Sequence, residues 1–310
     1  MPSVKVPIIW TGAELDRRSL LFGAGSSGLF LIASGRGIPA ADKDEFSLRV
    51  VESGHSLTDG IMPPLESFVR LRGSRRGTLV KSTIPGSPME WRWEHAPEGD
   101  DPDIRDPKVM ANFDVLVITE RVSLANTAPY HRSSEMALRW AEHAWRHGSD
   151  GAGARSILFA TWVDMTSGPD HPNPYNDPEG HIAFRERMPL EMARWEEIRG
   201  HVNAGLADGM PQMAMIPGPL IMAAAHDDIL AGKAPGLGSL SDLFADDIHL
   251  NDRGNYLIAL AHFAVIYSKD PRGLPANIPP RTGPDQAQAA WMQELVWRVL
   301  AEYRGGNGGD

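Results

Sequence analysis

The chain has 310 residues, of which 42% are hydrophobic, and a formal net charge of -10. This length and composition suit one large α/β core and exclude a disordered or fibrous protein; the positive charges form no stripe, so we expect no nucleic-acid partner. Cysteine is absent, which excludes disulfides, thiolate nucleophiles and thiolate metal sites.

The first predicted element is an export signal over residues 1–41. Arg17 and Arg18 precede a moderately apolar stretch that is rich in Gly and Ser, and small residues follow before a polar segment. Such a stretch is too short and too glycine-rich to span a bilayer stably, and its flanks are those of a secretory signal. The twin arginines resemble a Tat export signal, with Asp16 where Ser or Thr is usual. We therefore expect an exported protein, periplasmic or extracellular, with no stable membrane span. The alternative is an N-terminal helix, which the glycines disfavour.

Five apolar runs of strand length follow and alternate with helical patterns. The predicted strands are 47–53, 78–84, 114–119, 156–161 and 213–216. The predicted helices are 57–71, 133–147, 186–206, 219–230, 255–267 and 286–303. Strands that alternate with helices imply a parallel sheet with helices on both faces. We expect one α/β domain over 42–304 with a mostly parallel five-stranded sheet, and a disordered tail over 305–310.

A serine lies just beyond the first predicted strand. The apolar run stops at Gly54, and His55 and Ser56 follow. One interpretation is a turn alone, because Gly, Ser and Asp are common turn formers. The other is a nucleophile at the sheet edge, because ligands of open parallel sheets bind outside the carboxyl ends of the strands. A serine hydroxyl is weakly acidic, so this interpretation requires an imidazole within reach and a carboxylate that orients it.

The only Asp-x-x-His of the chain supplies such a pair near the other end of the sequence. Asp246 and His249 lie on a predicted loop before an apolar helix, which Asn251 or Asp252 would cap. The two intervening residues allow the chain to fold back, so that the carboxylate accepts the Nδ1 proton and Nε2 faces the pocket. Asp247 is the competing carboxylate, and spacing alone favours Asp246.

These blocks resemble the SGNH, or GDSL-type, hydrolases. The resemblance rests on Gly54-x-Ser56-Leu57, a glycine after the second strand, and Asp-x-x-His before the last core helix; it spans roughly residues 50–267. It implies a three-layer α/β/α sandwich of flavodoxin-like type that hydrolyses or transfers acyl groups on esters, with no metal or organic cofactor.

The resemblance also implies a role for each matched residue. Ser56 would be the nucleophile, His249 the general base and then the acid, and Asp246 the orienting carboxylate. The backbone N–H groups of Ser56 and Gly86 would donate to the oxyanion.

Two positions depart from the family pattern. His55 stands where an Asp usually precedes the serine, in a supporting role. The third block normally supplies an Asn side chain as an oxyanion donor, and here the strand is followed by Glu120. An ionised Glu120 would repel an oxyanion. It would serve only if protonated, or turned away to hold a substrate hydroxyl; otherwise Asn126 would take over as donor.

Two further segments are candidate parts of a substrate site. Trp91, Arg92 and Trp93 follow Gly86 and would form a platform, since aromatic faces stack on sugars and arginine grips carboxylates or hydroxyls; the alternative is that one tryptophan packs into the core and the other caps the loop. The segment 168–181 is rich in Pro, Asn and Asp and is expected to be a lid or substrate wall. We predict no metal site, although this loop holds three possible ligands, His171, Asp177 and His181.

Taken together, the sequence predicts an exported serine esterase that acts on an O-acyl, above all an acetyl, ester of a carbohydrate or small molecule. An O-acyltransferase with the same triad is the first alternative. The second is a catalytically inactive carbohydrate-binding protein of the same fold.

Overall fold

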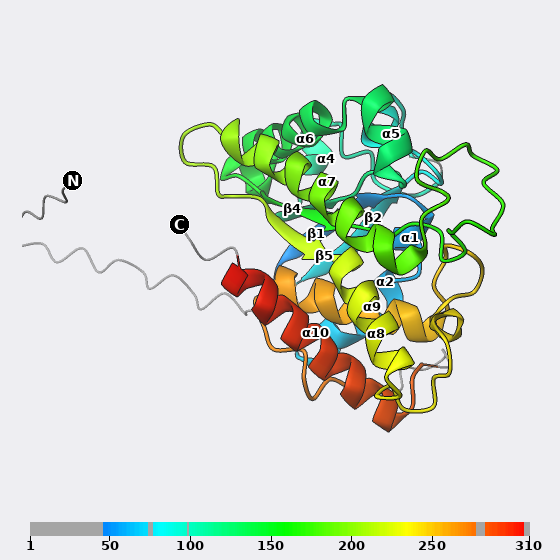
Figure 1. Ribbon diagram of the computed structural model, residues 1–310. Helices are drawn as coiled ribbons and strands as arrows, with labels where there is room; N and C mark the ends of the chain where they lie inside the picture. Colours follow the sequence, from blue (N-terminus) through cyan, green and yellow to red (C-terminus); the bar gives the residue numbers. More distant parts are fainter. Residues whose placement is uncertain (1–45, 74–76, 98, 277–282, 307–310) are drawn as a thin grey trace, which may run out of the picture. The chain divides into compact units, whose positions relative to one another are not determined.

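The computed structural model describes residues 46–73, 77–97, 99–276 and 283–306 (Figure 1). All of them belong to one compact unit, Lys43–Asp310. The predicted export signal lies outside the described residues. None of the helices within those ranges combines the length and the apolar composition that a membrane span requires.

Five strands form the central sheet in the order β2-β1-β3-β4-β5, and every neighbouring pair is parallel. The strands are β1 (Arg49–Gly54), β2 (Thr78–Thr83), β3 (Val115–Ile118), β4 (Arg155–Ala160) and β5 (Ala214–Pro217). The predicted α/β class is confirmed, and the sheet is wholly parallel. Because β1 lies between β2 and β3, the strand order reverses beside β1, and ligands of such sheets bind at this switch point.

Ten α-helices and two short 3₁₀ helices are present in the described part of the chain. The helices are α1 (Ser56–Asp59), α2 (Met62–Leu71), α3 (Met89–Glu94), α4 (Pro107–Met110), α5 (Leu124–His131), α6 (Ser133–His147), α7 (Phe184–Ala204), α8 (Gly218–Leu230), α9 (Asp252–Ile266) and α10 (Gln286–Gly306), with η1 (Ser149–Gly151) and η2 (Leu240–Leu243).

Several helices differ from the prediction. The helix expected over 57–71 is two helices, because Gly60 ends α1 and prolines occupy the first turn of α2, where a missing N–H costs nothing. Three short helices, α3, α4 and α5, were not predicted, since fewer than nine residues give too weak a period. Helix α10 continues to Gly306, into the predicted tail; residues 307–310 lie outside the described residues.

The sheet separates two hydrophobic clusters. Side chains alternate across β1, so Val50 packs with α2, α8, α9 and α10, and Val51 packs with α4, α6 and α7. Figure 1 shows α6 and α7 on one side of the sheet and α9 and α10 on the other. This is the predicted three-layer arrangement, and it leaves the carboxyl edge of the strands for function.

One carboxyl group is buried inside the first of these clusters. Glu52, on β1, is 1% exposed, and its Oε2 lies 3.5 Å from Nε2 of the fully buried His262 on α9. Nδ1 of His262 lies 3.0 Å from the carbonyl oxygen of Ile258, so Nδ1 carries the proton of the neutral ring. Burial raises the pKa of Glu52 to about 8 and lowers the pKa of His262 to about 4. Both groups are therefore neutral near pH 7.

This burial predicts a fall in stability between pH 7 and pH 8. An acid whose pKa is raised by folding holds its proton to higher pH in the folded state than in the unfolded state. The free energy of unfolding therefore falls as the pH rises from the unfolded-state pKa to the folded-state pKa. The lowered pKa of His262 makes the free energy of unfolding rise with pH, but only below pH 6.5, outside this interval. We expect wild type to lose about 1 kcal/mol more than Glu52→Gln over this interval. Urea unfolding of both proteins at the two pH values measures the difference, and equal losses would contradict it.

Candidate active site

A hydroxyl, an imidazole and a carboxylate lie in a hydrogen-bonded row at the carboxyl edge of the sheet. The Oγ atom of Ser56 lies 2.8 Å from Nε2 of His249, which is 193 positions away in the chain. Nδ1 of the same ring lies 2.8 and 3.1 Å from the two carboxylate oxygens of Asp246. The structure thus brings together the three residues that the sequence selects as a triad, with the ring between the hydroxyl and the carboxylate.

The Asp246 loop is shaped by its own carboxylate. Oδ1 accepts the backbone N–H groups of Ile248 at 2.9 Å and of His249 at 2.7 Å. Partial burial acts to raise the pKa of Asp246, but these N–H groups and the His249 ring hold that pKa below its ordinary value. Asn251 caps α9 by accepting the N–H groups of Arg253 and Gly254. Because its pKa is lowered, the carboxylate of Asp246 stays ionised beside the imidazole of His249.

Two hydrogen bonds attach this loop to the segment that follows β4. The indole Nε1 of Trp162 donates to the carbonyl oxygen of Ile248 at 2.9 Å. The backbone N–H of Met165 donates to the carbonyl oxygen of Asp247 at 2.7 Å. These bonds hold His249 over the sheet edge, so its ring meets the hydroxyl that β1 and α1 present.

The nucleophile helix packs directly on the end of β1. A Cβ atom at Gly54 would lie 2.1 Å from Oγ1 of Thr58, and one at Gly60 would lie 2.4 Å from Nδ2 of Asn255 on α9. A side chain at either glycine would therefore force Thr58 or Asn255 to move. The close approach sets α1 against both β1 and α9, which positions Ser56 relative to the His249 loop.

His55 supports the start of α1 as a neutral ring. It is 3% exposed; its Nε2 lies 3.0 Å from the carbonyl oxygen of Glu120, and its Nδ1 accepts the N–H of Leu57 at 3.4 Å. Burial and the positive charge of Arg92 lower the pKa of His55 to about 4. The unprotonated Nδ1 therefore caps the helix, and the ring ties α1 to the end of β3.

The two predicted backbone donors lie at adjoining strand ends. Ser56 is the first residue of α1, a position whose N–H has no partner within the helix. Gly86 lies in the turn after β2 with a φ of 65°, a conformation that favours glycine. The N–H of Ile84 donates to the carbonyl oxygen of Gly54 at 3.1 Å, which places this turn beside the end of β1.

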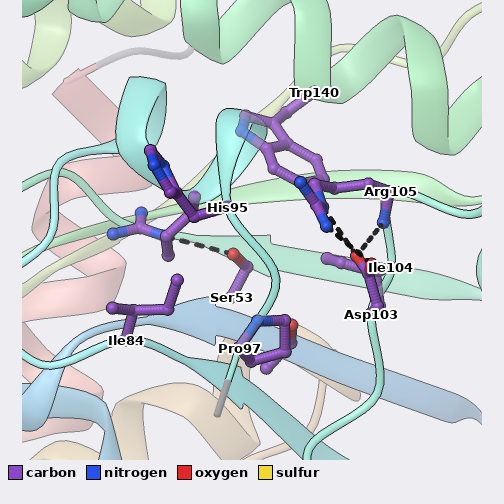
Figure 2. Close-up of a pocket in the computed structure, with 10 residues that line it drawn as sticks. Ser53, Ile84, His95, Pro97, Asp103, Ile104, Arg105 and Trp140 are labelled. Atoms are coloured by element: carbon purple, nitrogen blue, oxygen red, sulfur yellow. Dashed lines mark hydrogen bonds and ion pairs between the residues drawn. The ribbon is translucent and has the colours of Figure 1, made fainter.

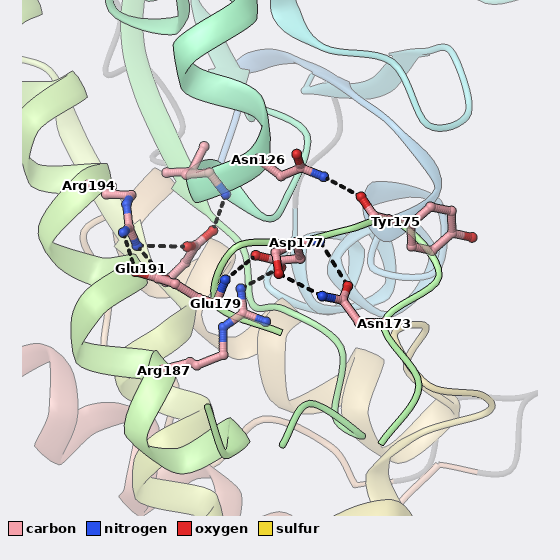
Figure 3. A network of polar contacts seen from close by, with 9 residues as sticks. Asn126, Asn173, Tyr175, Asp177, Glu179, Arg187, Glu191 and Arg194 are labelled. Atoms are coloured by element: carbon pink, nitrogen blue, oxygen red, sulfur yellow. Dashed lines mark hydrogen bonds and ion pairs between the residues drawn. The ribbon is translucent and has the colours of Figure 1, made fainter. Parts of the chain in front are cut away.

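Both sequence-based candidates for a third oxyanion donor have side chains that make hydrogen bonds elsewhere. Glu120 is 0% exposed, and its Oε1 accepts the N–H groups of Met89 at 2.9 Å and Arg121 at 2.7 Å. Burial raises its pKa, but the carboxyl group is turned inward to hold backbone amides. The Nδ2 of Asn126 donates to the carbonyl oxygen of Tyr175 at 3.1 Å (Figure 3). The assignment of the buried Glu120 side chain to the oxyanion is therefore corrected, whereas Asn126, whose amide has a second N–H group, stays a prediction.

The predicted Trp91-Arg92-Trp93 platform is not formed. Arg92 is 3% exposed and cross-links three strand ends, through Ser53 Oγ, the carbonyl oxygen of Ser87 and that of Thr119. Trp93 packs edge-on against Trp140 of α6, with ring centroids 4.8 Å apart. Only Trp91 is exposed, at 48%. Helix α3 was not expected, and its turn directs three consecutive residues in three directions.

A small cavity lies beneath α3 and not at Ser56 (Figure 2). Polar and apolar side chains both line it, among them Ser53, His95, Asp103, Arg105 and Trp140. Ser56, His249 and Asp246 are absent from its lining. The side chains of His249 and Asp246 are 41% and 58% exposed, so this part of the candidate site is open to solvent.

Ion pairs hold the segment 168–181 in place. Asp177 pairs with the buried Arg187 at 2.6 Å, and Glu179 pairs with Arg194 at 2.5 Å (Figure 3). This pairing fits a fixed wall better than a lid. In the described part of the chain, no group of three or more His, Cys, Asp or Glu side chains could hold a metal ion.

Comparisons with known proteins support the fold. No family model and no curated relative matches the chain. A DUF4886 family protein from Bacteroides uniformis ATCC 8492 is similar in structure, with a TM-score of 0.58 and 14% identity over 82% of this chain and 95% of that one. The lipase Lip_vut3 from a goat rumen metagenome matches with a TM-score of 0.34 and 14% identity over 71% of this chain and 98% of its own. The first likeness shows the fold alone, and the second is too low to carry an argument.

Proposed function

We propose that this protein is a serine esterase that removes an O-acyl group, above all acetyl, from a carbohydrate or a similar small ester. The observation that carries the proposal is the row of hydrogen bonds from Ser56 through His249 to Asp246. This is the geometry by which an imidazole activates a hydroxyl and a carboxylate orients the imidazole. The SGNH resemblance of the sequence agrees with it.

Each residue has a defined step in this reaction. The Oγ of Ser56 attacks the ester carbonyl carbon while Nε2 of His249 takes the hydroxyl proton. The carboxylate of Asp246 stabilises the imidazolium, and the N–H groups of Ser56 and Gly86 donate to the tetrahedral oxyanion. Loss of one such donor typically costs about 3 kcal/mol of transition-state stabilisation. His249 then protonates the leaving alcohol, and water releases the acyl group from Ser56.

The openness of the site favours hydrolysis over acyl transfer. His249 and Asp246 are both substantially exposed, so water reaches the ring that must activate it in the second half-reaction. An acyltransferase has to keep water away from its acyl-enzyme until a sugar hydroxyl arrives. We therefore place hydrolase activity ahead of O-acyltransferase activity.

The proposal is tested by turnover and by covalent labelling of the wild type. We expect hydrolysis of p-nitrophenyl acetate and butyrate, and modification by a fluorophosphonate at the peptide that contains Ser56, located by mass spectrometry. A label on another serine would contradict the mechanism. A folded protein that neither turns over nor reacts would point to the inactive carbohydrate-binding alternative.

We also propose that residues 1–41 direct export, on the sequence pattern alone. Changing both Arg17 and Arg18 to Lys is expected to leave the protein in the cytoplasm of a Tat-competent bacterial host, since the Tat signature is the arginine pair. Cell fractionation and immunoblotting of the two forms measure this. Export that is equal for both forms would refute a Tat route.

A further inference from the structure

The exposed aromatic side chains of the described residues lie on segments that leave the sheet at one edge. Trp91, Tyr130 and Tyr175 are 48%, 75% and 74% exposed, and the other large exposed hydrophobic side chains are aliphatic. Trp91 lies on α3, after β2; Tyr130 lies on α5, after β3; and Tyr175 lies on the loop after β4. Because the sheet is parallel, segments that follow β2, β3 and β4 all start at the edge that presents Ser56.

Polar contacts join the three segments that carry these rings. Glu90, next to Trp91, accepts from Arg132 at 2.5 Å and lies 3.2 Å from Nδ1 of His131, next to Tyr130. Near the start of α5, the Asn126 amide donates to the backbone carbonyl oxygen of Tyr175 at 3.1 Å (Figure 3). The three segments that carry the rings are therefore joined to one another, and we call Trp91, Tyr130 and Tyr175 the aromatic rim.

The spacing along α5 gives the aromatic rim some length. Asn126, which holds the backbone of Tyr175, lies four residues before Tyr130. The two residues therefore lie on one face of the helix, about 6 Å apart along its axis. Trp91 continues the rim beyond the end of α5, and its ring stacks at 3.6 Å on that of His95, which steadies it. The three rings come from three separate segments along the edge, so we expect a ligand that contacts all of them to be a chain of several sugar units.

The chemistry of the rim and the charge of the chain specify the ligand. Exposed aromatic faces with fixed polar neighbours suit sugars, whose C–H faces stack on rings while hydroxyls reach groups such as Arg132 and Glu90. A net charge of -10 opposes binding of a polyanion. The matching partner is a neutral carbohydrate chain.

We infer that the aromatic rim binds a neutral polysaccharide and delivers its acyl esters to Ser56. This inference rests on the proposed esterase function and deepens it: the substrate is a chain that occupies several positions along the sheet edge, and not an isolated small ester. Tyr130, Tyr175 and Trp91 are binding residues in this account, and none of them takes part in the chemistry.

The test separates chain binding from catalysis. Isothermal titration of xylohexaose into the folded protein measures binding without turnover, because this oligosaccharide carries no ester. Tyr130→Ala and Tyr175→Ala are each expected to weaken binding about 3- to 10-fold. Leu230→Ala, which removes an equally exposed side chain from α8, is the matched control and is expected to leave binding unchanged.

Kinetics on two esters give the second arm. The ratio of kcat/KM on acetylated xylan to kcat/KM on p-nitrophenyl acetate is expected to fall in both tyrosine variants by a similar factor, through KM. An unchanged ratio and unchanged xylohexaose binding would overturn the inference, as would equal binding of a hexamer of galacturonate. Absence of all esterase activity together with intact, tyrosine-dependent xylohexaose binding would instead refute the proposed catalysis and keep the rim.

Discussion

Replacing Ser56 by alanine is expected to reduce kcat for p-nitrophenyl acetate by about 10⁶-fold. The hydroxyl is the atom that would form the acyl-enzyme, and the variant keeps the fold because Cβ remains and α1 is capped by His55. His249→Ala is expected to have a similar effect. The double variant should be no worse than either single one, since the hydroxyl and the imidazole act as one unit. Initial rates, with folding checked by circular dichroism, measure this.

The matched control is Ser67→Ala. Ser67 is a partly buried serine of α2 whose Oγ donates to the carbonyl oxygen of Pro63 at 3.0 Å, outside the row of triad residues. We expect this variant to keep full activity. If Ser56→Ala retained the wild-type rate, Ser56 could not be the nucleophile, and the esterase mechanism would have to be abandoned.

A substitution of Asp246 by asparagine should lower kcat by about 10⁴-fold. An Asn side chain retains an oxygen that can accept the N–H groups of Ile248 and His249, so the loop keeps its shape. Its other terminus is an NH₂ group, which cannot accept the Nδ1 proton of His249 and stabilises the wrong tautomer. The loss therefore reports the carboxylate and not the fold of the loop.

Asp247→Asn is the natural comparison, because the two residues are adjacent and both were candidates. The carboxylate of Asp246 contacts the imidazole at 2.8 Å, whereas Asp247 contributes its backbone carbonyl to Met165. We expect kcat of Asp247→Asn to stay within about threefold of wild type, a change below 1 kcal/mol. A larger loss in Asp247→Asn than in Asp246→Asn would reverse the assignment. Steady-state kinetics of the two proteins decide between them.

Much of the fold could be predicted because its signals are local. The run from Val115 to Ile118 is apolar on both faces, which predicts a central strand, and the structure places β3 there. Helix α6 begins and ends as predicted, since its amphipathic period extends over fifteen residues. The split at Gly60 and helices α3, α4 and α5 were missed because four to eight residues carry little periodicity.

The sequence predicted which residues belong to the candidate site, but not how the side chains around it are oriented or exposed. Strand ends, one Asp-x-x-His and the need of serine for a base select Ser56, Asp246 and His249, and the structure shows these three side chains in contact. The choice between Trp91, Arg92 and Trp93 could not be made, because it depends on how α3 is turned against α6. The sequence did not single out Tyr130 and Tyr175, because residue type alone does not show whether a tyrosine side chain is exposed or buried.

The sequence by itself determined the alternation of strands and helices, and hence a parallel sheet whose strand ends share one edge. It also determined which residues could act there, because chemistry depends on side-chain type and on spacing along the chain. Only the tertiary structure decided that a hydroxyl and an imidazole 193 positions apart lie 2.8 Å from each other. It also decided that the Glu120 carboxyl group turns inward while three aromatic rings face solvent. The physical reason is that packing between distant segments sets the orientation of each side chain, because the burial of one side chain competes with the burial of its neighbours.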